Sequence, residues 1–217
     1  KRASYNNTSS DFIAAGASPR QSSAQMTTGT ATSSNPFETE EREVLRFLLK
    51  YGEASLGEFE FEDGKKEVSV GEYIVMELRQ DELESVSPVY NKMMELYEEN
   101  YQNENFSSSR FFVSNADSQI SSLATDLIAR EYPLSRIHSK LGVVSTEEDL
   151  LDELVPKVVT ELKWKKVKVL LEEKRQQLKK ADEEKNEEDF MRLLQELNNL
   201  QQAFIYISKA LGERTVV

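Results

Sequence analysis

The stretch that decides the fold is Val155–Leu211, VPKVVTELKWKKVKVLLEEKRQQLKKADEEKNEEDFMRLLQELNNLQQAFIYISKAL. It contains two apolar stripes at helical spacing: Val155, Val158, Val159, Leu162, Val169 and Leu170 in the first part, and Phe190, Leu193, Leu194, Leu197, Leu200, Phe204, Ile207 and Leu211 in the second. At roughly 100° per residue, one straight helix would carry these stripes on opposite sides and would need two cores. The pattern therefore predicts two helices that fold back on each other as an antiparallel hairpin.

The break between these two helices is predicted between Asp182 and Asp189, although this segment contains no glycine or proline. Asn186 and Asp189 have the spacing of an N-cap pair, and Glu187 and Glu188 suit the positive end of the helix dipole that follows. The rest of the charged run is predicted to be a solvated tip.

The first 36 of the 217 residues differ in composition from the rest of the chain. They are rich in Ser, Thr, Ala and Asn, and their large apolar residues are few: Tyr5, Phe12, Ile13 and Met26. Such a segment buries too little apolar surface to offset its chain entropy, so we expect residues 1–36 to be a disordered linker. It has neither the apolar run of a signal peptide nor the length of apolar sequence that crosses a bilayer. A chain that begins at Lys1 with a linker suggests a piece of a longer protein or a processed one.

The net charge of −12 is unevenly distributed. Residues 37–144 carry 11 basic and 22 acidic residues, whereas residues 145–217 carry 13 and 16. A domain this acidic repels phosphate backbones, so we expect a protein partner, with no direct binding of nucleic acid or membrane. The chain has no cysteine, which excludes disulfides, thiolate zinc sites and cysteine nucleophiles and fits a reducing, cytoplasmic setting.

Residues 37–144 are predicted to form a helical bundle subdomain. A first helix is expected over 39–51, with Thr39 as its N-cap and Gly52 as a left-handed stop. The alternating run after Glu58 and the Asp63-Gly64 pair predict either a small β-hairpin at 58–70 or an ordered loop. Further helices are expected to begin at Ser69 or Gly71, at Pro88, and at Asn115 or Asp117.

Residues 145–217 are predicted to hold a joint helix followed by the hairpin. Ser145-Thr146-Glu147-Glu148 has the pattern of a capping box at a helix start. Pro156 then either kinks a long helix or begins a new one. The predicted fold class is thus all-α, a multi-helix bundle followed by a C-terminal antiparallel helical hairpin, with at most one small β-hairpin at 58–70.

Motifs for catalysis, metals and cofactors are missing from the sequence. The eight glycines form no phosphate-binding loop, and His138 has no partner ligand at metal-site spacing, so we expect it to be structural or on the surface. We therefore predict no catalytic residue, no metal and no cofactor. Lys163, Lys165, Lys166 and Lys168 around Trp164 fit a patch that stacks a base, but nearby glutamates favour a solvated face with Trp164 at the edge of the hairpin.

Four segments resemble the C-terminal helicase-binding region of bacterial replicative DNA primases of the Bacteroidetes type, over about residues 37–217: Glu41–Gly52 (EREVLRFLLKYG), Tyr132–His138 (YPLSRIH), Leu154–Val159 (LVPKVV) and Leu193–Asn198 (LLQELN). The resemblance implies that a zinc-binding module and a polymerase core precede this region in the parent enzyme, and that this fragment is not itself catalytic. It also implies that the fragment docks onto the N-terminal domains of the hexameric replicative helicase at the replication fork, near the nucleoid. The acidic 52–70 stretch departs from the all-helical pattern of that family.

The resemblance also implies that the terminal hairpin is the main docking element. On its last helix, Ile205 and Tyr206 lie off the core stripe beside Gln202 and Lys209, which makes a mixed patch suited to an interface, and Arg214 follows Gly212. Alternatively, Ile205 packs beneath the bundle and Tyr206 only covers surface. We expect a monomer that binds the helicase through this patch; the alternative is a helical scaffold that self-associates through residues 156–211. A carboxylate metalloenzyme ranks behind both.

Overall fold

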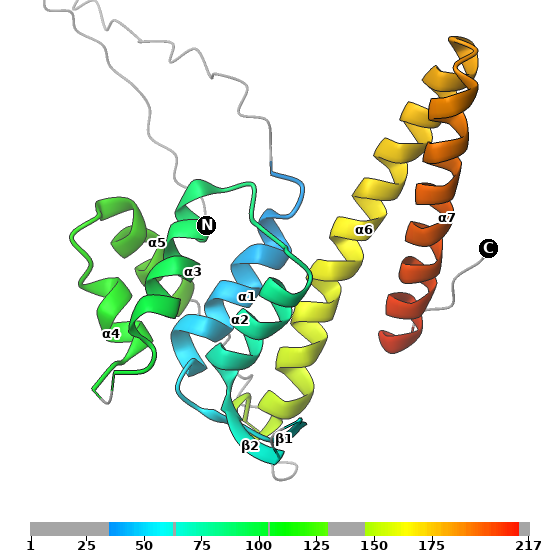
Figure 1. The fold of residues 1–217 in the computed structure, drawn as a ribbon. Helices are drawn as coiled ribbons and strands as arrows, with labels where there is room; N and C mark the ends of the chain where they lie inside the picture. Colours follow the sequence, from blue (N-terminus) through cyan, green and yellow to red (C-terminus); the bar gives the residue numbers. More distant parts are fainter. Residues whose placement is uncertain (1–34, 63, 104, 130–145, 213–217) are drawn as a thin grey trace, which may run out of the picture. The chain divides into compact units, whose positions relative to one another are not determined.

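The computed structural model describes residues 35–62, 64–103, 105–129 and 146–212. All of these described residues belong to one compact unit. Its helices form a bundle from which a long helical hairpin extends, so the predicted fold class is confirmed (Figure 1). Residues 1–34 of the predicted linker and the predicted boundary at 144/145 lie outside the described residues, so the domain division stays a prediction.

Helix α1 (Glu38–Tyr51) lies at the centre of the bundle and buries Val44, Leu45, Phe47, Leu48 and Leu49. The predicted N-cap, Thr39, is wrong, because the helix begins one residue earlier and Phe37 occupies the cap position. The Asn35 side chain accepts a hydrogen bond from the Phe37 N–H at 3.0 Å, and the Phe37 ring is buried in the core. A buried aromatic side chain thus sets the start of this helix.

Gly52 follows α1 but is not the left-handed stop that the sequence predicts. Its φ is −50°, in the right-handed helical region. A Cβ at this position would lie 2.4 Å from the Leu48 carbonyl oxygen and 3.1 Å from the Tyr97 ring. The buried Tyr97 hydroxyl donates to the Gly52 carbonyl at 3.1 Å, so glycine is needed here for close packing.

The small β-hairpin of the prediction is confirmed. Strands β1 (Ser55–Phe61) and β2 (Gly64–Ser69) pair antiparallel, with Phe61 opposite Gly64. Because an isolated two-stranded ribbon is marginal, it needs support from helices. Leu56 and Val68 provide this support by burial, and the Phe59 ring lies 5.6 Å from the ring of Tyr73 on the next helix.

Capping residues explain where the middle helices start. Ser69 forms a reciprocal capping box with Glu72 and begins α2 (Val70–Gln80), which selects Ser69 over Gly71. Pro88 is the first residue of α3 (Pro88–Asn100), as predicted. Asp117 accepts from the Gln119 N–H at the start of α5 (Ser118–Ala129). The short α4 (Ser108–Val113) was not predicted.

Helix α6 (Leu151–Glu183) follows a single 3₁₀ turn, Glu148–Leu150. Before this turn, the Asp149 carboxylate accepts from the Thr146 N–H and the Thr146 hydroxyl accepts from the Asp149 N–H. This capping box lies one residue later than the predicted one. Pro156 lies inside α6 and the helix continues through it, so the alternative in which Pro156 begins a new helix is wrong. Because proline has no N–H, one intrahelical hydrogen bond is lost at this position.

The predicted hairpin is formed by α6 and α7 (Glu187–Ala210). At the turn, the Asn186 N–H donates to the Ala181 carbonyl at 3.0 Å and the Lys185 N–H donates to the Asp182 carbonyl at 3.1 Å. This is a Schellman motif, with Lys185 at φ 54° in the position that glycine usually takes. Asn186 then caps α7 by accepting from the Asp189 N–H, as predicted.

Candidate functional site

The first half of α6 is bound to the bundle by apolar packing and by ion pairs. Val155, Val159 and Leu162 are buried in the core of the bundle. Lys163 Nζ lies 2.6 Å from carboxylate oxygens of both Glu77 and Asp81 on the α2 side. Burial alone would lower the pKa of Lys163, but the hydrogen bonds to these two carboxylates raise it. The lysine is therefore held in its charged form at this contact.

The other lysines around Trp164 are also engaged. Lys165 lies 3.3 Å from Glu40, and Lys166 lies 3.3 Å from Glu41, both on α1. Lys168 lies over the Trp164 ring, 4.5 Å from its centroid. Because three of the four lysines pair with carboxylates of the bundle, the cluster fastens α6 rather than forming a basic surface.

A carboxylate hub adds a further contact between α1 and the approach to α6. Glu147 accepts hydrogen bonds from Arg46 at 2.5 and 3.0 Å and from the Tyr51 hydroxyl at 2.7 Å. Lys50 lies 3.3 Å away. The Arg46 guanidinium is the main reason that the pKa of Glu147 falls to about 2. The start of α6 is thus fixed by charge as well as by burial.

From Trp164 to the turn, α6 packs against α7. The Trp164 indole stacks on Phe204, with ring centroids 5.5 Å apart, and its N–H donates to the Ser208 hydroxyl at 3.0 Å. Leu171 and Leu193 are buried between the helices. The sequence pattern predicts Trp164 at the edge of the hairpin but does not indicate Ser208, whose partner is 44 positions away in the sequence.

The predicted docking residues lie on α7. Tyr206 is 77% exposed, Gln202 and Lys209 are exposed, and Ile205 is half-buried. Arg214 lies outside the described residues. The four described residues are within two helical turns of one another, so the predicted patch is geometrically coherent. Its role as a binding site stays a prediction.

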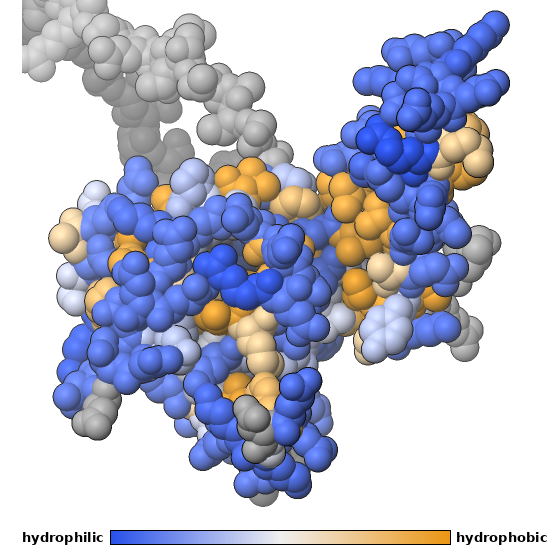
Figure 2. Space-filling model, in the orientation of Figure 1, coloured by the Kyte–Doolittle hydropathy of each residue, from blue (hydrophilic) through white to orange (hydrophobic). Residues whose placement is uncertain are grey.

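A second exposed apolar group lies nearer the tip of α7. Met191 is 63% exposed and Leu194 is 42% exposed. They line a shallow depression together with Arg192, Leu197 and three uncharged amides: Gln195, Asn198 and Gln201. Leu194 belongs to the stripe that the sequence predicted to be core, but two helices alone cannot enclose it. Figure 2 shows apolar side chains gathered on the hairpin, beside the strongly polar tip.

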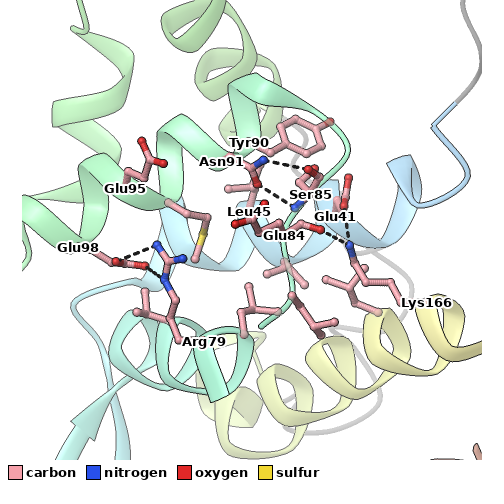
Figure 3. Close-up of a pocket in the computed structure, with 16 residues that line it drawn as sticks. Glu41, Leu45, Arg79, Glu84, Ser85, Tyr90, Asn91, Glu95, Glu98 and Lys166 are labelled. Carbon is pink, nitrogen blue, oxygen red and sulfur yellow. Dashed lines mark hydrogen bonds and ion pairs between the residues drawn. The ribbon is translucent and has the colours of Figure 1, made fainter. Parts of the chain in front are cut away.

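A hollow opens on the bundle between α1, α2, α3 and the first half of α6, with a volume of about 110 Å³ (Figure 3). Its walls are largely apolar and come from all four helices: Val44, Leu45, Val75, Leu78, Met94 and Leu162. This hollow is not evident from the sequence, because these apolar wall residues lie up to 118 positions apart, from Val44 to Leu162.

Charged side chains surround the hollow. Arg79 donates to both carboxylate oxygens of Glu98, at 2.7 and 3.0 Å. At the other end, Lys166 donates to the Glu84 carbonyl at 2.6 Å and lies 3.3 Å from the buried Glu41 (Figure 3). Among the described residues, the carboxylates of Glu84 and Glu95 form neither an ion pair nor a hydrogen bond. The opening is therefore acidic overall.

The described part of the chain gives no sign of a metal site or a membrane span. No group of three or more metal-ligating side chains occurs among the described residues, and no described helix has the length and hydropathy to cross a bilayer. His138 lies outside the described residues.

The fold and its surfaces define a small helical domain that carries a long helical hairpin. The chain belongs to the family described as Domain of unknown function (DUF8430), whose model matches residues 28–216. No curated protein and no solved structure matches the chain. The family match thus covers both the bundle and the hairpin, and it assigns no function to either.

Proposed function

We propose that this chain is a protein-docking module whose α6–α7 hairpin binds the N-terminal domains of a hexameric replicative helicase, as its resemblance to primases implies. The observation that carries the proposal is the exposed side of α7. Among the described elements, α7 packs mainly on α6, and Tyr206 projects into solvent from α7 while α6 is anchored to the bundle. Exposed aromatic side chains on a rigid support are typical of binding surfaces.

The proposal assigns docking, not chemistry, to this part of the chain. Lys163, Lys165 and Lys166 of α6 pair with bundle carboxylates, which argues against a phosphate-binding surface around Trp164. In the parent enzyme that the resemblance implies, the polymerase core would make primers in the cytoplasm at the replication fork. The hairpin would keep that core close to the helicase.

A titration of the labelled N-terminal region of the cognate helicase tests the proposal. We expect a micromolar or tighter Kd by fluorescence anisotropy. Tyr206→Glu should weaken binding about tenfold or more, because it places a charge at the centre of the patch. Met191→Glu is the matched control on the same helix, outside the patch. No binding by the unaltered chain would refute the function, whereas equal effects of the two variants would refute only the site.

The second candidate function is a scaffold that self-associates through the hairpin. The exposed Met191 and Leu194 favour it, because the one charged residue that lines the same depression, Arg192, is paired with Asp189. Such a surface can pair with its own copy with little charge repulsion. Light scattering across a concentration series separates the two. A dimer that Met191→Glu with Leu194→Glu dissociates would support the scaffold, and a concentration-independent monomer would oppose it.

A further inference from the structure

We propose that the hollow between α1, α2, α3 and α6 is a second docking site, which takes one aliphatic side chain from a protein segment whose adjacent residues are basic. The site is on the bundle and shares no residue with the exposed patches of α7. It therefore goes beyond the hairpin function, and each can fail without the other.

The size of the hollow selects a single side chain. Pockets for small molecules and cofactors are usually about 300–1,000 Å³. At about 110 Å³, this hollow is well below that range. An apolar cavity of about 150 Å³ holds a benzene molecule, so the space here suits a leucine, isoleucine or methionine side chain. Such single-residue anchors provide much of the affinity at protein interfaces.

The walls of the hollow are fixed, with one adaptable side. The Asn91 amide accepts from the Ser85 N–H at 2.8 Å and donates to the Ser85 carbonyl at 2.9 Å, which pins the loop after α2 (Figure 3). The same loop is anchored where Leu83 N–H donates to the Leu78 carbonyl. Met94 forms the adaptable wall, because its unbranched thioether can shift to fit an occupant. A preformed pocket lowers the entropy cost of binding.

The loop beside the hollow also carries an apolar lip. Val86 is 60% exposed and directly follows Ser85, which lines the hollow. The Val86 side chain is not among the described side chains that pack against the core of the bundle. In a complex it would lie against the backbone on either side of the inserted side chain, which extends the contact beyond one residue.

Charge selects the residues that flank the inserted side chain. The opening is lined by Glu41, Glu84, Glu95 and Glu98, against only Arg79 and Lys166. Both cations are already paired, Arg79 with Glu98 and Lys166 with Glu41, which leaves Glu84 and Glu95 to face an occupant. Both are exposed, so a lysine or arginine next to the anchor would reach them at the rim.

Three short peptides test the aliphatic anchor and the basic flanking residues separately. The probes are acetyl-Lys-Leu-Lys-amide, acetyl-Lys-Ala-Lys-amide and acetyl-Glu-Leu-Glu-amide, titrated into the full chain with labelled methyl groups and followed by NMR. The Lys-Leu-Lys peptide should shift the Met94 and Val75 methyl signals. It should bind about tenfold tighter than Lys-Ala-Lys, because only leucine fills the hollow. Added salt should weaken it.

Substitutions at the rim and in the wall complete the test. Glu84→Gln with Glu95→Gln should abolish the preference for Lys-Leu-Lys over Glu-Leu-Glu without affecting the fold, since both side chains are exposed and unpaired. Glu60→Gln with Glu99→Gln is the control, with the same charge change on other exposed carboxylates. Met94→Phe should block the leucine and leave only salt-sensitive attraction.

The outcomes that overturn the proposal are distinct. Equal affinities for the leucine and alanine peptides would remove the anchor, and equal affinities for Lys-Leu-Lys and Glu-Leu-Glu would remove the basic flank. Methyl shifts that occur only outside the hollow would remove the site. None of these results affects binding of the helicase region by α7.

Discussion

The bundle and the hairpin enclose their apolar side chains to very different degrees. In the bundle, Leu48, Met93, Phe112 and Ile120 are completely buried. In α7, by contrast, Leu193 is the one apolar residue that is buried among those described. A core shared by several helices shields its side chains on all sides, whereas a pair of helices can shield only the seam. The bundle therefore encloses most of its apolar surface, whereas the hairpin leaves part of its own exposed.

The two regions also differ in charge. Residues 35–129 carry 8 basic and 21 acidic residues, whereas residues 151–212 carry 12 of each. An approaching protein therefore meets little net repulsion along the hairpin but a strong negative field at the bundle. The two proposed docking sites follow this division, with an uncharged or mixed partner on α7 and a basic segment at the hollow.

The largest expected effect is the difference in stability loss between two phenylalanine substitutions, one in each region. Phe47→Ala should lower the free energy of unfolding by about 4 kcal/mol, because it empties a fully enclosed site in the bundle. Phe204→Ala, at the half-exposed seam of the hairpin, should cost about 1–2 kcal/mol. Urea unfolding followed by circular dichroism measures both. Equal costs would contradict the difference in enclosure between the two regions.

The next effect is a loss of stability in acid that depends on Glu147. Its pKa is about 2 in the folded protein and near 4.5 in the unfolded chain, so the unfolded state takes up the proton first as the pH falls. The stabilisation is complete above about pH 4.5 and is lost towards pH 2. It should amount to about 2 kcal/mol, allowing for the partial solvent exposure of the group.

Glu147→Gln is the variant that isolates this effect. It keeps the size of the side chain but removes the charge that Arg46 and Lys50 face. The variant should be less stable than the unaltered chain at pH 7 and should approach it near pH 2. Glu148→Gln, an exposed neighbour, is the control. Parallel stability curves for the Glu147 variant and the unaltered chain would refute the role of the hub.

A smaller effect is expected at the seam of the hairpin. Ser208→Ala leaves the Trp164 indole N–H without its partner and should cost about 1 kcal/mol. Trp164 is the only tryptophan of the chain, so its fluorescence reports directly on the packing of α6 against α7. A cycle with Trp164→Phe and the double variant, measured by circular dichroism, gives the coupling energy. A coupling near zero would mean that the hydrogen bond adds nothing to the seam.

The sequence predicts those features that depend on local spacing. The phase of the two stripes gives the hairpin, Asn186 and Pro88 give helix starts, and Asp63-Gly64 gives the β-hairpin. The errors have tertiary causes. Thr39 is not the N-cap because burial of the Phe37 side chain fixes the start of the helix one residue earlier. Glycine is needed at position 52 because Tyr97 packs close to it, and not because it ends the helix.

The candidate sites divide in the same way. Tyr206 could be found from the sequence, because it lies off a regular apolar stripe on one helix. The hollow could not be found in this way, because it is formed only when Lys166 and Arg79 meet their ion-pair partners on other helices. The short α4 was missed because six residues carry too little periodic signal. Local pattern thus predicts the helices, while contacts between distant residues determine the pocket.

The smallest expected effect is a gain in stability at the two helix ends that lack a glycine. Lys185, at φ 54°, ends α6 in the hairpin, and Glu82, at φ 51°, ends α2 in the bundle. A residue with a Cβ pays about 1 kcal/mol in this left-handed conformation, which glycine adopts freely. After the greater entropy of glycine in the unfolded chain is subtracted, Lys185→Gly and Glu82→Gly should each gain about 0.5 kcal/mol.

The two substitutions should act on different regions. Lys185→Gly should slow amide hydrogen exchange chiefly along α6 and α7 near the tip, because local opening of a thinly packed hairpin starts at its turn. Glu82→Gly should instead raise the midpoint of global unfolding, because α2 belongs to the enclosed bundle. Lys185→Ala removes the charge but keeps the Cβ, so it should give no gain. If Lys185→Ala stabilised the hairpin as much as Lys185→Gly, the gain would come from loss of the lysine side chain and not from the backbone conformation.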